Sequence, residues 1–364
     1  MIKKRRIILA IPSLQAGGME RVMAELAGYF AGKEYMEVHL VLYGLKRDIF
    51  YQLPSNIIIH KPSFEFDNSG LRIKSIFKTI SFLRNTISSV QPDAVLSFGE
   101  YWNSLVLLSL LWKKIPVFVS DRCQPDKKLG RLQEFLRKWL YPKAAGIVVQ
   151  TAIAKKIYQE NIGHKNIQVI GNPIRSIHTK TPVQKQNIVL TVGRLIKTKH
   201  HDELIKLFAG INMAGWKLII VGDDVPKQNN LQRLKELVQQ LGMTDKVILA
   251  GRQQNVEEYY TTSKIFAFTS SSEGFPNVVG EAQAAGLPVV TFDCPCGPSE
   301  MITDGKNGFL IPLFDYKTFR EKLELLMNDE LLREKFGADG KHSVRQFSVD
   351  ITGATFENFI LGEK

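Results

Sequence analysis

The sequence predicts an α/β protein with two doubly wound domains, each built on a parallel sheet. Short aliphatic runs alternate with amphipathic helical stretches along the 364-residue chain, and such alternation is typical of parallel sheets with right-handed crossovers. The alternation pauses once, near residues 171–186, and then starts again. A chain of this length also exceeds what one hydrophobic core usually supports. Two domains facing each other are therefore expected.

The first half begins with the aliphatic run 7–11, which does not alternate with polar residues and so predicts a strand covered on both faces. Apolar residues at helical spacing follow over 20–30. Amphipathic helices are expected at 71–90 and 129–140, with their apolar sides packed on the sheet. Further strands are expected at the aliphatic runs 38–43, 94–98, 117–119 and 146–149.

The second half repeats this pattern. Strands are expected at 188–192, 217–221, 247–250, 265–268 and 288–292. Helices are expected to begin near Asp202, Asn229, Asn255, Val278 and Tyr316. The expected domains are residues 1–175 and 176–345, with a C-terminal helix in 346–364 that packs back on the first domain. Ligands of such sheets bind at the carboxyl ends of the strands, so the cleft between domains is the expected site.

Composition favours a soluble cytoplasmic protein. The longest apolar candidate, 104–112, has about half the length needed to cross a bilayer. The basic start at residues 3–6 weakly resembles a signal peptide, but no small-residue cleavage site follows, so export is not favoured. Cys123, Cys294 and Cys296 are odd in number and lack a matching ligand pair. Neither a disulfide framework nor a zinc site is expected.

The net charge of +12 is concentrated in the first half. Residues 1–175 hold 26 Lys and Arg against 13 Asp and Glu, a net +13, whereas residues 176–364 hold 22 against 23, a net −1. The cations of 71–90 and 129–140 have two open explanations: solvated outer faces of packed helices, or contact with an anionic membrane surface or a polyprenyl-diphosphate acceptor. Nucleic acid is not expected, because no recognised binding module accompanies the charge.

Two loops at predicted strand ends suit an anion. Gly17 and Gly18 stand between a strand and a helix, where the backbone can approach a ligand, although the third glycine of the dinucleotide fingerprint is missing. Arg194 and Lys199 follow the strand 188–192. A guanidinium can grip two phosphate oxygens while an ammonium neutralises the rest, so this pair suits a diphosphate. A solvated basic turn is the alternative.

Two further loops follow later strands. In 270–281 a Gly-Phe-Pro turn precedes a helix, whose free amides can bind hydroxyl or phosphate oxygens. Glu273 and Glu281 flank this turn and indicate carbohydrate recognition, with a capping acid and a surface acid as the alternative. The loop 293–300 is rich in turn formers and is expected to shape the cleft wall, with Cys294 and Cys296 as spacers.

Together these motifs resemble the signature of family 4 glycosyltransferases, retaining enzymes with the two-domain GT-B fold. The resemblance rests on Gly193-Arg194-Leu195 with Lys199, and on Glu273 and Glu281 within SEGFPNVVGEA. Residues 17–21, 285–290 and 304–308 fit the same family. The likeness covers nearly the whole chain and is loosest over 48–146. Within the family, the chain resembles bacterial enzymes that build capsular, exopolysaccharide or lipid-linked repeat units.

The resemblance implies roles for individual residues. Arg194 and Lys199 would bind the donor diphosphate and stabilise the departing nucleotide. Glu273 would lie beside the donor sugar without acting as a covalent nucleophile, and Glu281 would hold the ribose hydroxyls. The remaining donor contacts would come from Gly18, Arg252, Gly274, Phe275, Pro276, Asn277 and Val278.

The resemblance also implies a hexosyltransferase that works at the inner face of the cytoplasmic membrane and needs no metal cofactor. No Asp-x-Asp motif occurs, and the two cations would replace a metal. UDP is the favoured nucleotide for a hexose or N-acetylhexosamine donor, with GDP-mannose left open, and the acceptor would be a saccharide or polyprenyl-diphosphate-linked. Asp121 and Arg122 stand where many relatives carry a histidine, and their role is open.

Two other function classes are weighed against transfer. An NAD-dependent oxidoreductase is disfavoured, because neither opening strand is followed by Gly-x-Gly-x-x-Gly. A GT-B-fold epimerase or a non-catalytic nucleotide-sugar-binding protein stays open. Nucleotide release that requires an acceptor would distinguish transfer from both.

Overall fold

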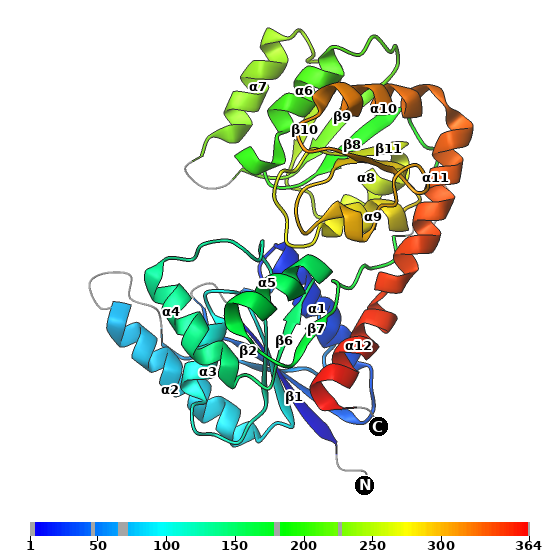
Figure 1. Ribbon diagram of the computed structural model, residues 1–364. Coiled ribbons are helices and arrows are strands. Elements are labelled where there is room, and N and C mark those ends of the chain that lie inside the picture. Colours follow the sequence, from blue (N-terminus) through cyan, green and yellow to red (C-terminus); the bar gives the residue numbers. More distant parts are fainter. Residues whose placement is uncertain (1–3, 45–47, 65–71, 178–182, 225–227, 363–364) are drawn as a thin grey trace. The chain divides into compact units, whose positions relative to one another are not determined.

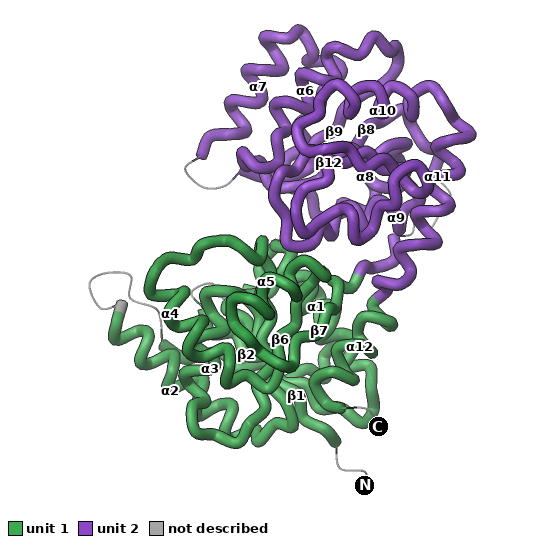
Figure 2. The backbone as a smooth tube through the Cα atoms, viewed as in Figure 1, with its two compact units in different colours: residues 1–173, 349–364 green, residues 174–348 purple. Residues whose placement is uncertain are grey.

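The computed structural model describes residues 4–44, 48–64, 72–177, 183–224 and 228–362. The chain divides into two compact units, residues 1–173 with 349–364 and residues 174–348 (Figures 1 and 2). Lys3, Leu71 and part of the predicted linker, 178–182, lie outside the described residues. The boundary falls just before Ile174 rather than after Arg175. Ile174 is buried, and its amide donates to the Phe347 carbonyl at 2.7 Å, which ties it to the second unit.

Unit 1 contains a seven-stranded sheet in the order β3-β2-β1-β4-β5-β6-β7, and every pair is parallel. The central strands are buried on both faces, as their unbroken aliphatic runs predict. The strands are β1 (Arg5–Ile11), β2 (Met36–Leu42), β3 (Ile58–His60), β4 (Ala94–Phe98), β5 (Val117–Ser120), β6 (Gly146–Val149) and β7 (Ile167–Val169). The helices are α1 (Gly18–Ala31), α2 (Arg72–Val90), α3 (Asn103–Ser109), α4 (Arg131–Leu140), α5 (Ala152–Ile162) and α12 (Val349–Leu361).

Unit 2 repeats the architecture with six parallel strands in the order β10-β9-β8-β11-β12-β13. The prediction of two Rossmann-like domains with parallel sheets is thus confirmed. The strands are β8 (Ile188–Val192), β9 (Lys217–Val221), β10 (Val247–Gly251), β11 (Ile265–Phe268), β12 (Val289–Phe292) and β13 (Phe309–Ile311). The α-helices are α6 (His201–Ala209), α7 (Asn230–Gln240), α8 (Val256–Thr262), α9 (Asn277–Ala284), α10 (Tyr316–Asn328) and α11 (Glu330–Ser343).

Several elements were not predicted. The strands β3, β7 and β13 have three residues each, too few to show a period. Helix α3 begins at Asn103, directly before the apolar run 104–112, whose lack of amphipathic spacing hid it. The three short strands complete edges of the two sheets and are fixed by pairing with their neighbours rather than by their own pattern.

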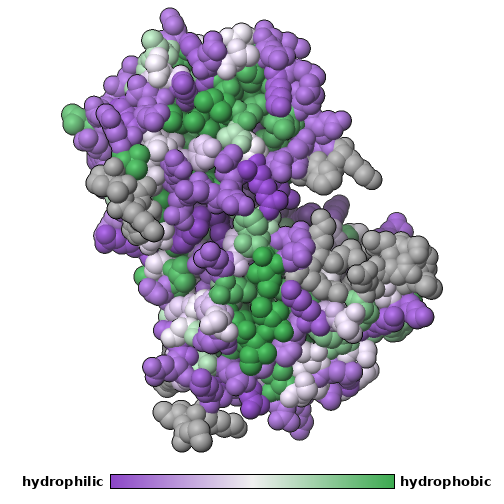
Figure 3. All heavy atoms as spheres, turned by 180° about the vertical axis from the view of Figure 1, so that it is seen from behind, coloured by the Kyte–Doolittle hydropathy of each residue, from purple (hydrophilic) through white to green (hydrophobic). Residues whose placement is uncertain are grey.

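The apolar sides of α2 and α4 are not packed as completely as the sequence predicts. On α4, Leu136 faces the core and Leu140 is buried, but Leu132 and Phe135 are 70% and 64% exposed. On α2, Ile73 is 71% exposed. The prediction that packing on the sheet accounts for both stripes is therefore wrong: each helix turns only part of its apolar side inward. Apolar side chains also gather in unit 1 on the side shown in Figure 3.

The last helix, α12, belongs to unit 1 and packs on α1. Phe356 is fully buried with its ring 6.4 Å from that of Phe98. Glu357 accepts hydrogen bonds from the hydroxyls of Tyr29 at 3.1 Å and Tyr35 at 2.8 Å. Gly353 permits this close approach, because a Cβ there would come within 2.5 Å of the Tyr29 ring. The chain therefore ends in the unit in which it began.

Replacing Phe356 with Ala is expected to lower the free energy of unfolding of unit 1 by about 3–5 kcal/mol, because a fully buried aromatic ring leaves a cavity. Urea unfolding followed by tryptophan fluorescence measures this, since three of the four tryptophans lie in unit 1. The matched control is Ile351→Ala on the same helix, where the side chain is 52% exposed and little change is expected. Equal losses in both variants would contradict the packing of α12.

Candidate functional site

The strand order of unit 2 reverses between β8 and β11, which are hydrogen-bonded neighbours although β9 and β10 intervene in sequence. The loops that leave these strands therefore lie side by side at their carboxyl ends, where ligands of open α/β sheets bind. The amide of Ser271 donates to the Thr198 carbonyl at 2.8 Å, and the Thr269 hydroxyl donates to the Lys199 carbonyl at 2.8 Å. The loop after β8, which carries Arg194 and Lys199, is thus hydrogen-bonded to the loop after β11, which carries Glu273.

The contact between these two loops places Lys199 next to Glu273. The Lys199 Nζ lies 2.5 Å from Glu273 Oε1, and the side chains are only 14% and 13% exposed. The Lys199 ammonium also lies 4.8 Å from the centre of the Phe268 ring. A charge-assisted hydrogen bond and a ring face therefore hold the ammonium in one place before any ligand arrives. These two residues are 74 positions apart in the sequence, which could not show that their side chains are in contact.

Arg194 is exposed, but the backbone beneath it is held firmly. The Leu195 amide donates to the Asp223 carbonyl at 2.9 Å, and the Asn230 amide group donates to the Leu195 carbonyl at 2.6 Å. His201 Nε2 lies 3.3 Å from the Arg194 carbonyl. Within the described residues, the Arg194 guanidinium has no hydrogen-bonding or ion-pair partner. A fixed backbone thus presents a guanidinium that is available to a ligand.

Burial lowers the pKa of His201 to about 4, and the charge of Lys199 contributes. His201 is therefore neutral at pH 7, and it can donate from Nε2 to the Arg194 carbonyl without adding a cation to the loop. Because its pKa in the unfolded chain is higher, the unfolded chain binds a proton first as the pH falls. The stability contribution of neutral His201 is thus lost as the pH drops below about 6.5 toward 4.

The turn before α9 offers backbone donors. Pro276 is buried, and Phe275 packs on Phe347 with ring centres 5.4 Å apart. The Asn277 amide donates to the Phe275 carbonyl at 3.0 Å, so it is used inside the turn. By contrast, no described residue accepts a hydrogen bond from the amides of Gly274, Phe275 or Val278. These three N–H groups at a helix start can meet an anion or a hydroxyl.

Glu281 differs from the exposed acid that the alternative interpretation requires. It is 2% exposed, and its Oε2 accepts a hydrogen bond from the Tyr260 hydroxyl at 2.9 Å. Tyr260 is fully buried in α8 and was not singled out in the sequence, where a tyrosine on a helix carries no distinguishing signal. The Tyr260 hydroxyl therefore holds the Glu281 carboxylate in position. Its predicted contact with ribose stays a prediction.

The other predicted donor contacts lie apart in the chain. Arg252 is exposed directly after β10 in unit 2. Gly18 is exposed at the start of α1 in unit 1, next to Gly17, which both donates to and accepts from the Tyr51 hydroxyl, at 3.0 and 2.8 Å. Gly18 and the loops of β8 and β11 belong to different units, so the predicted contact of Gly18 with the donor phosphate also stays a prediction.

The cysteines beside the site, Cys294 and Cys296, are buried. Cys294 is 1% exposed, and burial, followed by the charge of Glu273, raises its pKa to about 12. A thiol with that pKa stays neutral at pH 7 and is a poor nucleophile. This state fits a cysteine that packs the wall of the site, as the sequence interpretation has it.

Asp121 and Arg122 are held inside unit 1. Asp121 is buried and accepts from the hydroxyl of Tyr141 at 2.5 Å and from the amide group of Asn103 at 2.8 Å. Arg122 donates to Asn172 at 2.5 Å, and its guanidinium lies 3.8 Å from the centre of the Phe98 ring. Burial raises the pKa of Asp121 and lowers that of Arg122 to about 9. Both side chains thus make their contacts with other residues of unit 1.

Gly222 was missed by the sequence analysis, although a glycine directly after a strand was a usable signal. A Cβ on Gly222 would overlap the carbonyl oxygen of Gly193. The β8 and β9 loops can touch only because this position has no side chain. Gly222 therefore permits the observed position of the loop that carries Arg194.

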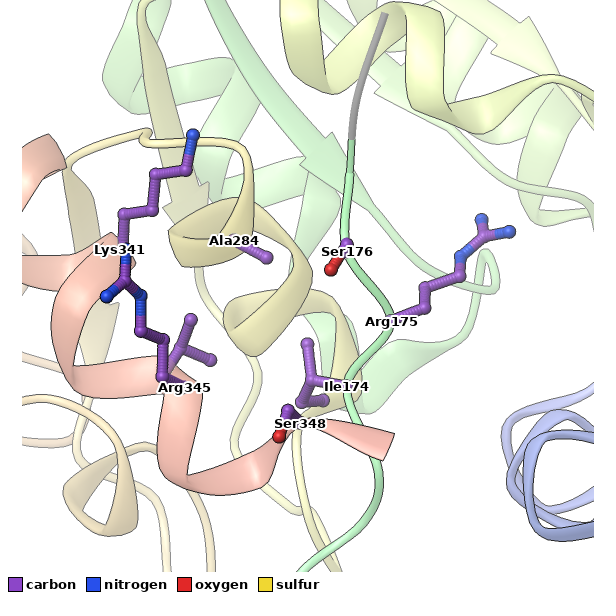
Figure 4. Close-up of a pocket in the computed structure, with 8 residues that line it drawn as sticks. Ile174, Arg175, Ser176, Ala284, Lys341, Arg345 and Ser348 are labelled. Atoms are coloured by element: carbon purple, nitrogen blue, oxygen red, sulfur yellow. The ribbon is translucent and has the colours of Figure 1, made fainter. Parts of the chain in front are cut away.

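A cavity of about 250 Å³ in unit 2 is lined by the first residues of the unit, 174–176, and by residues near its end, 341–348 (Figure 4). Its lining includes Arg175, Lys341 and Arg345. In Figure 4, Arg175 extends away from Lys341 and Arg345, and its guanidinium pairs with Glu257 at 2.8 Å. The three cations therefore do not converge on one point, and this cavity is not an anion site comparable to the loops of β8 and β11.

The described residues lack two kinds of feature. Within them, no cluster of three or more His, Cys, Asp or Glu side chains is placed to hold a metal ion. Nor does any helix there combine the length and the apolar character that crossing a membrane requires.

Comparison with known proteins matches both halves of the chain. The family "Glycosyl transferases group 1" matches residues 174–343, and "Glycosyltransferase Family 4" matches residues 16–176. The amylovoran biosynthesis glycosyltransferase AmsD of Erwinia amylovora is 29% identical over 333 residues, which cover 88% of this chain and 89% of AmsD. A Campylobacter jejuni enzyme is 26% identical over 351 residues, 94% of this chain and 95% of that protein. Its name is GalNAc-alpha-(1->4)-GalNAc-alpha-(1->3)-diNAcBac-PP-undecaprenol alpha-1,4-N-acetyl-D-galactosaminyltransferase.

The solved structures agree on the fold. Anabaena HepE, crystallised with UDP and glucose, superposes with a TM-score of 0.78 at 15% identity, over 97% of this chain and 98% of HepE. With the two parallel sheets described above, this likeness identifies the fold as GT-B.

Gly222→Ala is expected to lower the free energy of unfolding of unit 2 by about 1–3 kcal/mol and to displace the Arg194 loop, because the new methyl group overlaps the Gly193 carbonyl. Trp216 fluorescence during urea unfolding gives the first quantity, and amide chemical shifts of Gly193 and Arg194 give the second. Gly242→Ala is the matched control: its φ is +64° but nothing lies within 4 Å. It should lose about 1–2 kcal/mol from backbone strain alone, with unchanged loop shifts. Identical loop shifts in both variants would contradict the role of Gly222.

Proposed function

The chain belongs to glycosyltransferase family 4, and we propose that it transfers a hexose or N-acetylhexosamine from a nucleoside diphosphate sugar, with retention of the anomeric configuration. One observation carries this proposal. Lys199, fixed by Glu273, and the exposed Arg194 stand at the carboxyl ends of β8 and β11, beside a turn with three available amides. Such an arrangement suits a diphosphate with a sugar attached.

Each part of the site meets one part of the donor. The Arg194 guanidinium can grip two phosphate oxygens, and the Lys199 ammonium supplies a point charge on the same loop. The amides of Gly274, Phe275 and Val278 are the donors for sugar hydroxyls or a phosphate oxygen. Glu273 would accept from a sugar hydroxyl while it holds Lys199, and Glu281, braced by Tyr260, would hold the ribose.

The reaction follows from where charge develops. The bond between the anomeric carbon and the diphosphate oxygen breaks, and its electron pair leaves with the nucleoside diphosphate. The acceptor oxygen then bonds to the same carbon from the same face, and its proton passes to the departing phosphate oxygen. Arg194 and Lys199 would stabilise the negative charge on the leaving group as it forms. No enzymic nucleophile is needed, and we assign none.

We further propose that these two cations take the place of a metal ion. Electrostatic stabilisation by fixed charges needs no reorganisation when the bond breaks, so it serves a leaving diphosphate well. Both side chains are on one short segment of unit 2 that is anchored by backbone hydrogen bonds. The proposed transfer therefore requires no cofactor.

The proposed donor carries UDP, and the proposed acceptor is a lipid-linked saccharide in bacterial surface polysaccharide synthesis. HepE holds UDP in the same fold. The names of two relatives support the acceptor: one is an amylovoran biosynthesis enzyme, and the other names a PP-undecaprenol-linked saccharide. The net +13 of residues 1–175 would favour work at an anionic membrane surface.

Incubation with UDP-sugars should release UDP only when a lipid-linked saccharide acceptor is present, because the sugar passes to the acceptor. A thermal-shift screen of UDP- and GDP-sugars selects the donor first, since a true ligand raises the melting temperature. Mass spectrometry then follows the acceptor, and the rate should be unchanged by EDTA. Conversion of the donor sugar to its epimer without transfer would point to an epimerase instead. Loss of activity in EDTA would overturn the metal-independent part alone.

Arg194→Ala should lower turnover at least about a hundredfold with little change in stability, because the guanidinium is exposed and each phosphate-binding cation is expected to provide about 3 kcal/mol. Lys197→Ala, in the same loop and also exposed, is the control and should stay active. Turnover is measured with saturating donor and acceptor, and the melting temperature is recorded alongside. Near-normal turnover of Arg194→Ala would defeat the assignment.

Lys199→Ala requires a different design, since it leaves the Glu273 carboxylate without its cation. This variant should lose both activity and stability. In the double variant Lys199→Ala with Glu273→Gln, the stability should largely return while turnover stays low. Recovery of turnover in the double variant would show that Lys199 acts only as the partner of Glu273.

A further inference from the structure

His200 directly follows Lys199 and has a backbone conformation that residues with a side chain rarely adopt. Its φ of +51° and ψ of +39° lie in the left-handed region, between the short 3-10 helix Lys197–Lys199 and the start of α6. Glycine occupies this region freely, whereas a residue with a Cβ is strained there. The imidazole does not offset that strain by capping α6, because no amide of this fully described helix donates to it. The reason for a histidine here therefore lies in its other contacts.

The His200 imidazole connects the loop after β8, residues 193–200, to the loop after β11, residues 269–276. Its Nε2 lies 2.9 Å from the Ser271 hydroxyl oxygen, which lies 3.3 Å from the Thr198 carbonyl oxygen. A carbonyl can only accept, so the Ser271 hydroxyl donates to Thr198 and its oxygen accepts from His200 Nε2. The backbone amide of Ser271 donates to the same carbonyl at 2.8 Å. The two loops are thus joined at one point by backbone and side-chain hydrogen bonds.

Phe314, in the loop after β13, holds the imidazole from a second side. The two ring centres are 5.4 Å apart and the ring planes meet at 78°, which is an edge-to-face contact. Phe314 also has a left-handed backbone, with a φ of +67°, and its ring centre lies 6.3 Å from that of the fully buried Phe292. Two residues with strained backbones therefore touch each other beside Lys199. Such strain gathers at functional sites, where the surrounding structure holds it in place.

The contact of His200 with Ser271 lies close in the chain to both Lys199 and Glu273. Lys199 precedes His200, and its carbonyl accepts from the Thr269 hydroxyl at 2.8 Å. Glu273 follows Ser271 by two residues, and its Oε1 lies 2.5 Å from Lys199 Nζ. The contact therefore sets the separation of the two backbone segments from which the ammonium and the carboxylate extend. Without it the segments can move apart, and the ammonium no longer has one fixed place.

We infer that His200 is a positioning residue for the sugar transfer. By holding the loop after β8 against the loop after β11, its imidazole keeps the Lys199 ammonium where the leaving diphosphate gains charge. This role rests on the proposed function and is exerted through Lys199 rather than by contact with donor or acceptor. Fixed charge is effective because it needs no movement when the bond breaks.

The consequence falls on the transition state. A displaced ammonium stabilises the developing charge less well, whereas Arg194 and the amides of the turn before α9 still bind the donor beforehand. Loss of the imidazole should therefore lower kcat and leave KM for the donor nearly unchanged.

His200→Gly tests this role, because glycine keeps the left-handed backbone and only the side chain is lost. Turnover at saturating donor and acceptor should fall about tenfold, since small displacements of a catalytic group lower rates strongly. KM for the donor should change by less than about twofold. The melting temperature should change little, because glycine relieves the backbone strain. A lower melting temperature with full turnover would show that His200 only stabilises unit 2, and would overturn its positioning role.

Asn229→Gly is the matched control. Asn229 also precedes a helix of unit 2, α7, and its φ of +51° equals that of His200. Its side chain is exposed and caps no amide of that helix, which is described throughout. This variant removes an equally left-handed side chain and should keep the turnover of wild type. Equal losses in Asn229→Gly and His200→Gly would indicate a general effect of added glycine, and would contradict a role of the imidazole.

Ser271→Ala removes the hydrogen-bonding partner of the imidazole and shows whether His200 acts through it. In the double variant His200→Gly with Ser271→Ala, turnover should equal that of the less active single variant, because both substitutions break the same contact. Losses that multiply in the double variant would mean that His200 acts elsewhere, and the route through Ser271 would be wrong.

The same assay separates this role from the proposed function. If wild type transfers sugar, Arg194→Ala loses turnover and His200→Gly keeps it, the positioning role fails while the proposed function stands. If wild type transfers sugar to no acceptor, the proposed function fails, and the role of His200 in transfer fails with it.

Discussion

The parallel pairing of β8 with β11 is the constraint on which the rest of unit 2 depends. Two strands that are separated in sequence by β9 and β10 become neighbours, and their outgoing loops must then share one edge of the sheet. The cation of one loop meets the carboxylate of the other there, at Lys199 and Glu273. Had β8 been flanked by β9 and β10 instead, the same residues would lie strands apart, and no diphosphate could touch both loops.

The two cations of the site are held in different ways. Lys199 is held by Glu273 and by the Phe268 ring, whereas Arg194 stands exposed on an anchored backbone. Burial keeps two neighbouring groups neutral, because it lowers the pKa of His201 and raises the pKa of the Cys294 thiol. The positive charge of Lys199 is therefore fixed in place, and that of Arg194 is free to meet a ligand. This arrangement suits a reaction whose difficulty is the charge of the leaving group.

Unit 1 uses its side chains differently. Asp121 accepts hydrogen bonds from Tyr141 and Asn103 of the same unit, and Arg122 donates to Asn172 there. Part of the apolar side of α4 is instead exposed, with Leu132 and Phe135 at 70% and 64%. The net charge is divided unevenly along the sequence, +13 over residues 1–175 and −1 over residues 176–364.

The sequence by itself determined the class of fold, because short aliphatic runs such as 7–11 alternate with amphipathic helical stretches, as is typical of parallel sheets covered on both faces. It also located Arg194, Lys199, Glu273 and Glu281, since glycines, prolines and charges at strand ends are local signals. Three-residue strands and the hydrogen bond of Tyr260 to Glu281 left no local signal, and the glycine at 222, although visible after its strand, did not show which carbonyl it approaches. Nor could helical spacing tell which apolar side of α4 meets the sheet. Those features depend on what lies across the fold, and only the tertiary structure brings distant residues within contact distance.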